Sequence, residues 1–207
     1  MPISTRGKYK TQTVELVIST LSQVNRCLLY DKSEHRFFSS NSVERNQNQS
    51  DKNLSTQVQE LLENSKMSPE ELSQVFVLLG PGSFTSLRIG VNFAQGLAQS
   101  LKIPLFGLPT SSLFPNDFFI SLRPALTADL SIEECLKKEI EFLKVSTNSE
   151  HTIEVPSKDS LILGTRENFD WPEEEAILRA IQNKANWTKK VEIEYGLTPK
   201  ISGKRES

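Results

Sequence analysis

Apolar and polar positions along this chain follow first a strand pattern and then a helix pattern. The segment from Thr13 to Leu21 is apolar and rich in β-branched side chains, which is typical of a buried strand. Cys27 to Tyr30 and Arg36 to Ser39 are two further short strand candidates. The polar residues Asp31 to Ser33 form the predicted turn between them. These three strands can pair as a meander.

A polar stretch separates this meander from the first predicted helix. Ser39 to Asn53 contains one apolar side chain, Val43, and therefore predicts a mobile loop that acts as a spacer. Four apolar residues at helical spacing then predict an amphipathic helix that ends near Ser65: Leu54, Val58, Leu61 and Leu62. Ser68 to Glu71 has the capping-box pattern, with a proline just inside it, and predicts one short helical turn.

Strands and helices alternate in the next part of the chain. Val75 to Leu79 is an unbroken apolar run, which favours a strand covered on both faces, as in a parallel sheet. A helix is expected from about Ser83 to Leu101, ending before Ile103 and Pro104. Leu105 to Leu108 is the next short strand. The order predicts an α/β protein whose mixed sheet is covered by helices.

The pattern weakens after Pro109. Ser131 and Glu134 form a second capping box, and a helical stripe follows it: Ile132, Cys135, Leu136, Ile140 and Leu143. Thr152 to Val155 and Leu161 to Leu163 are strand candidates, and a last helix opens at Trp171. The tail from Thr198 is expected to be loose. No internal repeat is visible in the sequence.

Composition narrows the class of protein. A length of 207 residues fits one compact domain or two small lobes. The formal net charge of −2 gives no basic field that would draw the chain to nucleic acid or to an anionic membrane. The two cysteines, Cys27 and Cys135, lack CxxC spacing, so a reducing, cytoplasmic setting is expected. No apolar run is long enough to span a membrane.

A glycine-rich turn precedes the second long helix. The residues that we assign to this structural motif are Gly80, Pro81, Gly82, Ser83, Phe84 and Thr85. Gly82 can take a positive φ, and Ser83 or Thr85 can cap the helix. Backbone N–H groups at such a junction can bind an anion, but the lysine of a phosphate-binding P-loop is absent. The pattern therefore favours a structural turn.

Small residues recur every fourth position along the same helix: Ser86, Gly90, Ala94 and Ala98. A glycine inside a helix costs about 1 kcal/mol relative to alanine, so its presence suggests a close approach. Two interpretations fit the stripe. It can pack against the chain's own core, or it can form a flat surface on which another subunit docks. The second interpretation predicts that Gly90→Leu weakens association and leaves the monomer folded.

The pieces G-P-G-S-F-T, L-R-I-G, A-Q-G-L-A and I-P-L-x-G follow one another between residues 80 and 107. In this order they resemble the bacterial TsaB (YeaZ) family. The resemblance implies the actin-like (ASKHA) fold of two ribonuclease-H-like lobes, here residues 1–114 and a shorter, divergent lobe at 115–207. It also implies a non-catalytic subunit for the threonylcarbamoyladenosine modification of tRNA. That subunit binds a TsaD-like partner, and a TsaE-like ATPase completes the assembly.

In this family the docking surface is built largely from the two helices of the first lobe. The resemblance therefore implies partner contacts by the apolar stripe of the first helix and the small-residue stripe of the second: Leu54, Val58, Leu61, Leu62, Ser86, Gly90, Ala94 and Ala98. A homodimer through the same helices is a second expectation. Transfer RNA would be reached only indirectly, and no membrane contact is expected.

The chain departs from the family where catalytic relatives carry phosphate and metal ligands. Ser19 stands where the first strand usually ends with an aspartate, and Ser86 replaces a family glycine. The only histidines, His35 and His151, show no metal-ligand spacing, and neither H-E-x-x-H nor G-x-S-x-G occurs. We therefore expect no catalytic residue, metal or cofactor, and no tight binding of ATP. The alternatives are a nucleotide-binding enzyme that holds phosphate at the Gly80–Ser83 turn, or a glycoprotease-like protein.

Overall fold

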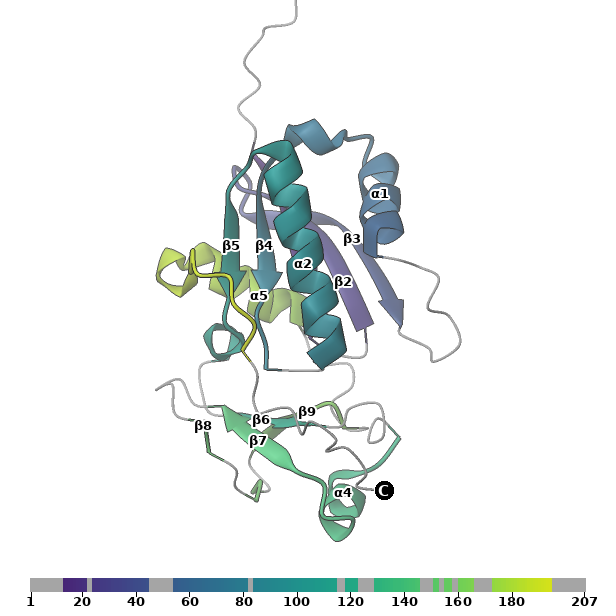
Figure 1. The fold of residues 1–207 in the computed structure, drawn as a ribbon, viewed down its shortest axis with the longest axis vertical. Helices are drawn as coiled ribbons and strands as arrows, with labels where there is room; N and C mark the ends of the chain where they lie inside the picture. Colours follow the sequence, from purple (N-terminus) through teal and green to yellow (C-terminus); the bar gives the residue numbers. More distant parts are fainter. Residues whose placement is uncertain are drawn as a thin grey trace, which may run out of the picture.

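The fold is given by a computed structural model, which describes residues 13–21, 24–44, 54–81, 84–114, 118–122, 129–145, 151–152, 155–157, 160–165 and 173–194. A five-stranded mixed sheet forms its first layer, in the order β3-β2-β1-β4-β5 (Figure 1). β1 (Val14–Ser19), β2 (Val24–Asp31) and β3 (Arg36–Glu44) form the expected antiparallel meander. β4 (Leu72–Leu78) and β5 (Leu105–Leu108) run parallel to β1.

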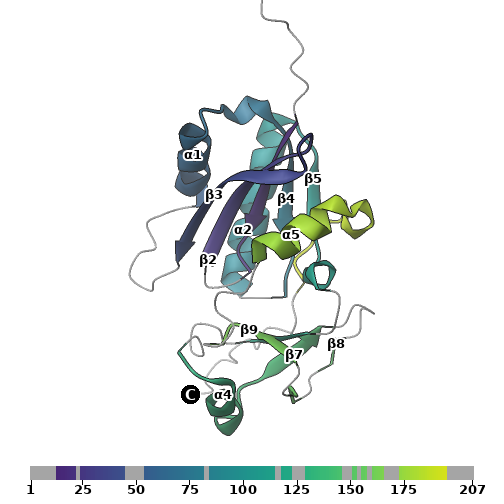
Figure 2. The same cartoon turned by 180° about the vertical axis from the view of Figure 1, so that it is seen from behind.

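Helices cover both faces of this sheet, which explains why most residues of its central strands are apolar and buried. Leu16 and Ile18 face α1 (Leu54–Asn64) and α2 (Phe84–Leu101), and short η1 (Pro69–Glu71) leads from α1 into β4. Val17 points to the opposite face, where α5 (Glu173–Gln182) lies (Figure 2). Burial on both sides is the usual environment of parallel strands, as the run at 75–79 predicts.

A second sheet follows, in the order β8-β7-β6-β9. It is built from β6 (Phe118–Ser121), β7 (Phe142–Val145), β8 (His151–Thr152) and β9 (Leu161–Leu163). β6 pairs antiparallel with β7 and parallel with β9, as β1 pairs with β2 and β4. The two sheets therefore repeat one topology, although no repeat is visible in the sequence.

Two predicted boundaries in these sheets are wrong. Residues 39–44, expected in a loop, belong to β3, because α1 supports this polar edge strand: Gln57 Nε2 donates to the carbonyl oxygens of Asn41 (2.8 Å) and Asn25 (3.0 Å). The remainder of that loop, 45–53, lies outside the described residues. The helix predicted through Leu143 ends at Lys137 as α4 (Ile132–Lys137), and Leu143 lies in β7 instead.

The C-terminal part of the chain returns to the first sheet. The apolar face of α5 packs into one core with Val17 and Phe76: Ala176, Ile177, Ala180 and Ile181. α5 also contacts two short helices, η2 (Thr110–Leu113) and η4 (Lys184–Asn186), and η4 follows α5 in the chain. A single cut at residue 114 therefore separates the two sheets but not the elements that cover them. The helix start predicted at Trp171 and the tail from Thr198 lie outside the described residues.

A buried carboxylate lies at the start of β1. Glu15 is only 1% exposed, and its Oε1 accepts a hydrogen bond from Gln74 Nε2 at 2.7 Å. Lys32 Nζ lies 3.9 Å from the same oxygen, while Oε2 has no hydrogen-bond partner. Burial raises the pKa of Glu15 to about 7, against the smaller opposing effects of Lys32 and Lys184.

Glu15 should make the stability of the fold fall as the pH rises. Its pKa is about 7 in the folded chain and 4.5 as an ordinary group, so ionisation opposes folding increasingly between these two values. At about 1.4 kcal/mol per pKa unit, the full penalty above pH 7 is about 3 kcal/mol. We expect Glu15→Gln to be stabilised relative to wild type by up to that amount more at pH 8 than at pH 4.5. Urea unfolding at both pH values measures the difference, and an equal effect at both would contradict it.

Candidate docking surface

The glycine turn between β4 and α2 is only partly described. Gly80 has a φ of 107°, a conformation that favours glycine, and its carbonyl oxygen accepts from the Thr110 amide at 3.1 Å. The positive φ and the cap assigned from the sequence to Gly82 and Ser83 lie outside the described residues. α2 begins at Phe84, which is half-buried, and Thr85 is exposed.

The structure buries all eight predicted partner-contact residues in the chain's own fold: Leu54, Val58, Leu61, Leu62, Ser86, Gly90, Ala94 and Ala98. The small residues of α2 face the sheet, and the apolar stripe of α1 joins the same core as Leu16 and Ile18. These side chains offer little surface to a partner, although Val58 and Leu62 also line a groove between the two helices. The small-residue stripe therefore packs against the chain's own sheet, and contact of these residues with a partner stays a prediction.

Gly90 shows how close this packing is. A Cβ at this position would lie 3.0 Å from Cγ2 of Thr20 and closer still to its Oγ1. Thr20 follows β1 directly and is itself 1% exposed, so it has little room to move. By contrast, a Cβ at Gly96 would meet nothing within 4 Å. The close approach inferred from the glycines is thus real at Gly90, and it is made to the sheet.

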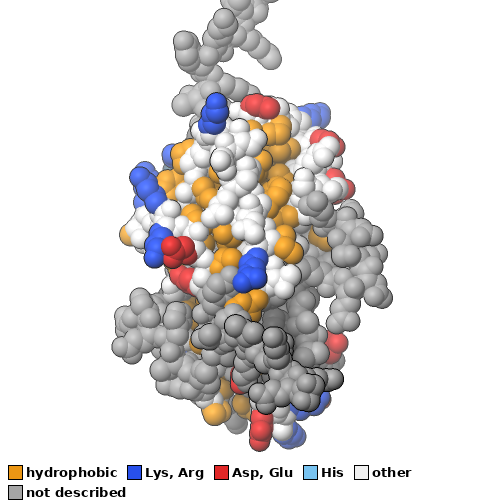
Figure 3. Space-filling model, viewed as in Figure 1, with side chains coloured by type: hydrophobic (Ala, Val, Ile, Leu, Met, Phe, Trp, Pro, Cys, Tyr) orange, Lys and Arg blue, Asp and Glu red, His pale blue; other side chains and the backbone are white. Residues whose placement is uncertain are grey.

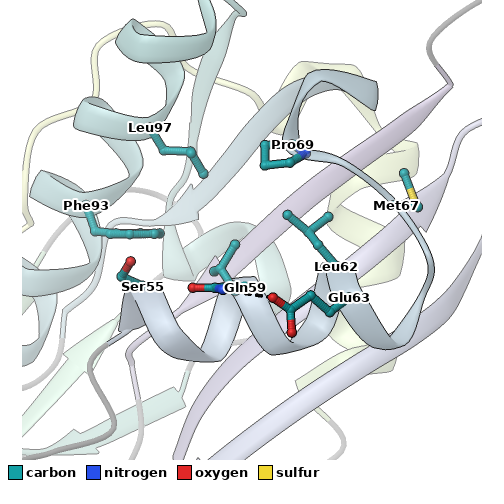
Figure 4. A pocket seen from close by; sticks show the side chains of 9 residues that line it. Ser55, Gln59, Leu62, Glu63, Met67, Pro69, Phe93 and Leu97 are labelled. Carbon is teal, nitrogen blue, oxygen red and sulfur yellow. Dashed lines mark hydrogen bonds between the residues drawn. The ribbon is translucent and has the colours of Figure 1, made fainter.

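What remains accessible is a groove of about 390 Å³ between the two helices (Figure 4). α1 contributes Ser55, Gln59 and Glu63 to its side, with Val58 and Leu62 beneath them. Gln59 Nε2 donates to Glu63 Oε1 at 2.8 Å, which orders the polar rim. Four further residues complete the lining, two from α2 and two from the connection after α1: Phe93, Leu97, Met67 and Pro69.

Large apolar side chains continue this groove along α2. Ile89, Phe93 and Leu97 recur at four-residue spacing, so they form one stripe beside the buried small-residue stripe. Ile89 is 51% exposed, and the other two are half-buried. Figure 3 shows hydrophobic side chains gathered over α2 and along its border with α1. The four-residue spacing of these apolar residues is visible in the sequence. The docking surface expected from the sequence included the small-residue stripe of α2 but not these residues.

Catalytic chemistry finds little support in the part of the chain that the structure describes. Ser19 at the end of β1 is fully buried, and His35 is engaged by the hydroxyl of Tyr30 at 3.2 Å from its Nδ1. Burial raises the pKa of Cys27 to about 12, which keeps this thiol protonated and unreactive. Within the described ranges, no three His, Cys, Asp or Glu residues are grouped as metal ligands require. No helix in those ranges is long and apolar enough to cross a membrane.

Comparison with known proteins finds related sequences for part of the chain and a similar fold for most of it. The family profile described as TsaD, tRNA N6-adenosine threonylcarbamoyltransferase, matches residues 43–114. The chain is 43% identical over 56 residues to the tRNA threonylcarbamoyladenosine biosynthesis protein TsaB of Buchnera aphidicola subsp. Schizaphis graminum, which covers 27% of each protein. It is 50% identical over 48 residues to that of Bacillus subtilis, covering 23% of this chain and 21% of the relative.

The structure of YeaZ from Pseudomonas aeruginosa superposes with a TM-score of 0.50, covering 72% of this chain and 70% of that one at 15% identity. The chain is therefore homologous to TsaB proteins over part of its length and is similar in fold to YeaZ. Its two lobes have the ASKHA fold. The aligned segments span only 21–27% of the length of these two TsaB relatives, so the homology is partial. The stretch that matches the family profile contains both α1 and α2, and therefore both walls of the groove.

The two glycines of α2 provide a matched test of the packing. Gly90→Ala should destabilise the fold by about 1–3 kcal/mol, because its Cβ would overlap Thr20. Gly96→Ala should stabilise it by about 1 kcal/mol, because alanine favours the helix and nothing obstructs the methyl group. Thermal unfolding of both variants measures the difference. A Gly90→Ala protein at least as stable as wild type would show that α2 does not lie this close to β1.

Proposed function

We propose that this chain is a non-catalytic subunit of the machinery that makes N6-threonylcarbamoyladenosine in tRNA, and that it docks on a TsaD-like partner through the groove between α1 and α2. The observation that carries the proposal is the partly exposed apolar stripe of Ile89, Phe93 and Leu97 beside that groove. It lies within the stretch that matches the family profile. The names of the TsaB relatives supply the process.

The shape and chemistry of the groove suit a protein partner. Its floor is apolar, and its polar rim carries Ser55, Gln59 and Glu63, which matches the usual arrangement of a hydrophobic centre bordered by polar groups. α1 and α2 lie on the same face of the first sheet (Figure 1), with the groove between them, so an apolar face of a partner helix could lie along them. A second copy of this chain would offer the same surface, which makes a homodimer the competing assembly.

Several features support a role without catalysis. The end of β1 has Ser19 in place of a carboxylate, which leaves this position without a charged ligand for Mg²⁺. The net charge of −2 supports contact with tRNA through the assembly rather than through this chain alone. In the assembled complex, a TsaE-like ATPase would supply the nucleotide chemistry, and the chain itself would need no cofactor.

Ile89→Glu should abolish docking and leave the chain folded. Half of the Ile89 side chain is already exposed, so the glutamate can remain in water in the free chain. In the complex it would bury a charge against apolar groups, which costs at least about 1.4 kcal/mol, or a tenfold loss of affinity. Calorimetric titration of the TsaD homologue from the same organism measures the change.

Gln99→Glu is the matched control, because it places the same side chain on an exposed position of α2 outside the groove. We expect this variant to bind like wild type. Equal affinity of wild type and Ile89→Glu for the partner would contradict the docking surface. If the wild-type chain dimerises and only the dimer is lost in Ile89→Glu, the groove serves self-association instead.

A further inference from the structure

The segment after α5 crosses the outer edge of the first sheet in two differently held halves. Its first half is anchored on the α5 face, where Trp187 packs against Phe76 and Phe106 with ring centroids 4.7 and 5.2 Å away. Trp187 Nε1 also donates to the carbonyl oxygen of Ile181 at 3.0 Å. Thr188 then exchanges two backbone hydrogen bonds with Gly107 of β5, at 2.8 and 3.0 Å. This half is tied to the sheet by aromatic packing and by strand-like pairing.

The second half, residues 191–194, lies on the other face of the sheet, along the flank of α2 that is turned away from α1 (Figure 1). Val191 and Ile193 are only half-buried against the core there. Among the described residues, two hydrogen bonds hold its main chain, from the Glu194 amide to the Leu79 carbonyl oxygen at 2.9 Å and from Gln95 Nε2 to the Val191 carbonyl oxygen at 3.4 Å. The second of these is long. This half is therefore held more weakly than the first.

Glu194 ends the described segment in a position that suits its neutral form. Burial raises the pKa of its carboxyl to about 7. The elements packed around it offer little charge: β4 and β5 contain no ionisable side chain, and α2 contains only Arg88. On the segment itself, Lys190 Nζ pairs with the exposed Glu192 at 2.9 Å.

We propose that residues 191–194 form a latch that opens and closes on α2 and the end of β4 while Trp187 and Thr188 stay anchored, and that ionisation of Glu194 favours the open state. Lys189 and Lys190, both exposed, lie between the two halves and form the hinge. Opening uncovers the flank of α2 at Gln95 and the end of β4 at Leu79. The latch thus controls access to a second face of α2, and it does not depend on the proposed function.

The size of the effect follows from the two ionisation states. With a pKa of about 7 for Glu194 in the closed latch and 4.5 in the open one, the opening constant should rise about tenfold between pH 6 and pH 8. Hydrogen exchange of the Glu194 amide, followed by NMR and corrected for its intrinsic rate, reports that constant directly. The Thr188 amide, bonded to Gly107, serves as the internal reference for the anchored half.

Two single substitutions complete the experiment on the full chain. Glu194→Gln removes the ionisation and should leave the opening constant unchanged between the two pH values. Glu192→Gln alters the exposed neighbour two positions earlier and should keep the tenfold rise. The proposal is overturned if the wild-type opening constant is flat with pH, if the Thr188 amide opens in parallel with that of Glu194, or if Glu194→Gln still shows the rise.

Discussion

The contact between Gly90 of α2 and Thr20 at the end of β1 sets the position of the elements that form the candidate site. Because Gly90 has no side chain, the helix can lie directly on the sheet at this point. The larger apolar residues of α2 must then project to its sides. On the side of α1, Phe93 and Leu97 do so, and with α1 they enclose the groove. The groove is therefore a consequence of a close helix–sheet approach.

The same sheet is completed by a distant part of the chain. Its second face would be exposed if the chain ended after β5, because Val17, Phe76 and Leu108 point there and need a cover. α5 and Trp187 provide that cover after the chain has built the second sheet. Residues of the second sheet, among them Phe118 and Leu143, join the same core. The two lobes thus share one apolar core, in addition to a smaller cluster within the second lobe and a cluster between the first sheet, α1 and α2.

Local patterns in the sequence were sufficient for most of the first lobe. β4 and β5 show as apolar runs beside Gly and Pro, and both capping boxes at Ser68 and Ser131 are confirmed. Features that depend on distant contacts were missed. β3 extends through polar residues because the Gln57 side chain of α1 donates a hydrogen bond to its backbone. The sequence of residues 39–44 alone does not predict this contact with a distant helix. The repeat of the β-sheet order was equally invisible, since a topology can recur while its side chains diverge.

The candidate site shows a more general limit. Small residues every fourth position permit a close approach, but their spacing is the same whether the neighbour is a sheet, a helix or another subunit. At Gly90 the neighbour is Thr20 at the end of β1, which lies seventy positions earlier in the chain. The stripe of Ile89, Phe93 and Leu97 is a better indicator of a docking surface. The small-residue face of α2 already packs in the chain's own core, so packing within the chain does not require a second apolar stripe beside it. A partly exposed stripe of this kind indicates a surface that is covered in an assembly. In α2 the small residues therefore let the helix lie close to the sheet, and the large residues next to them form the docking surface that we propose.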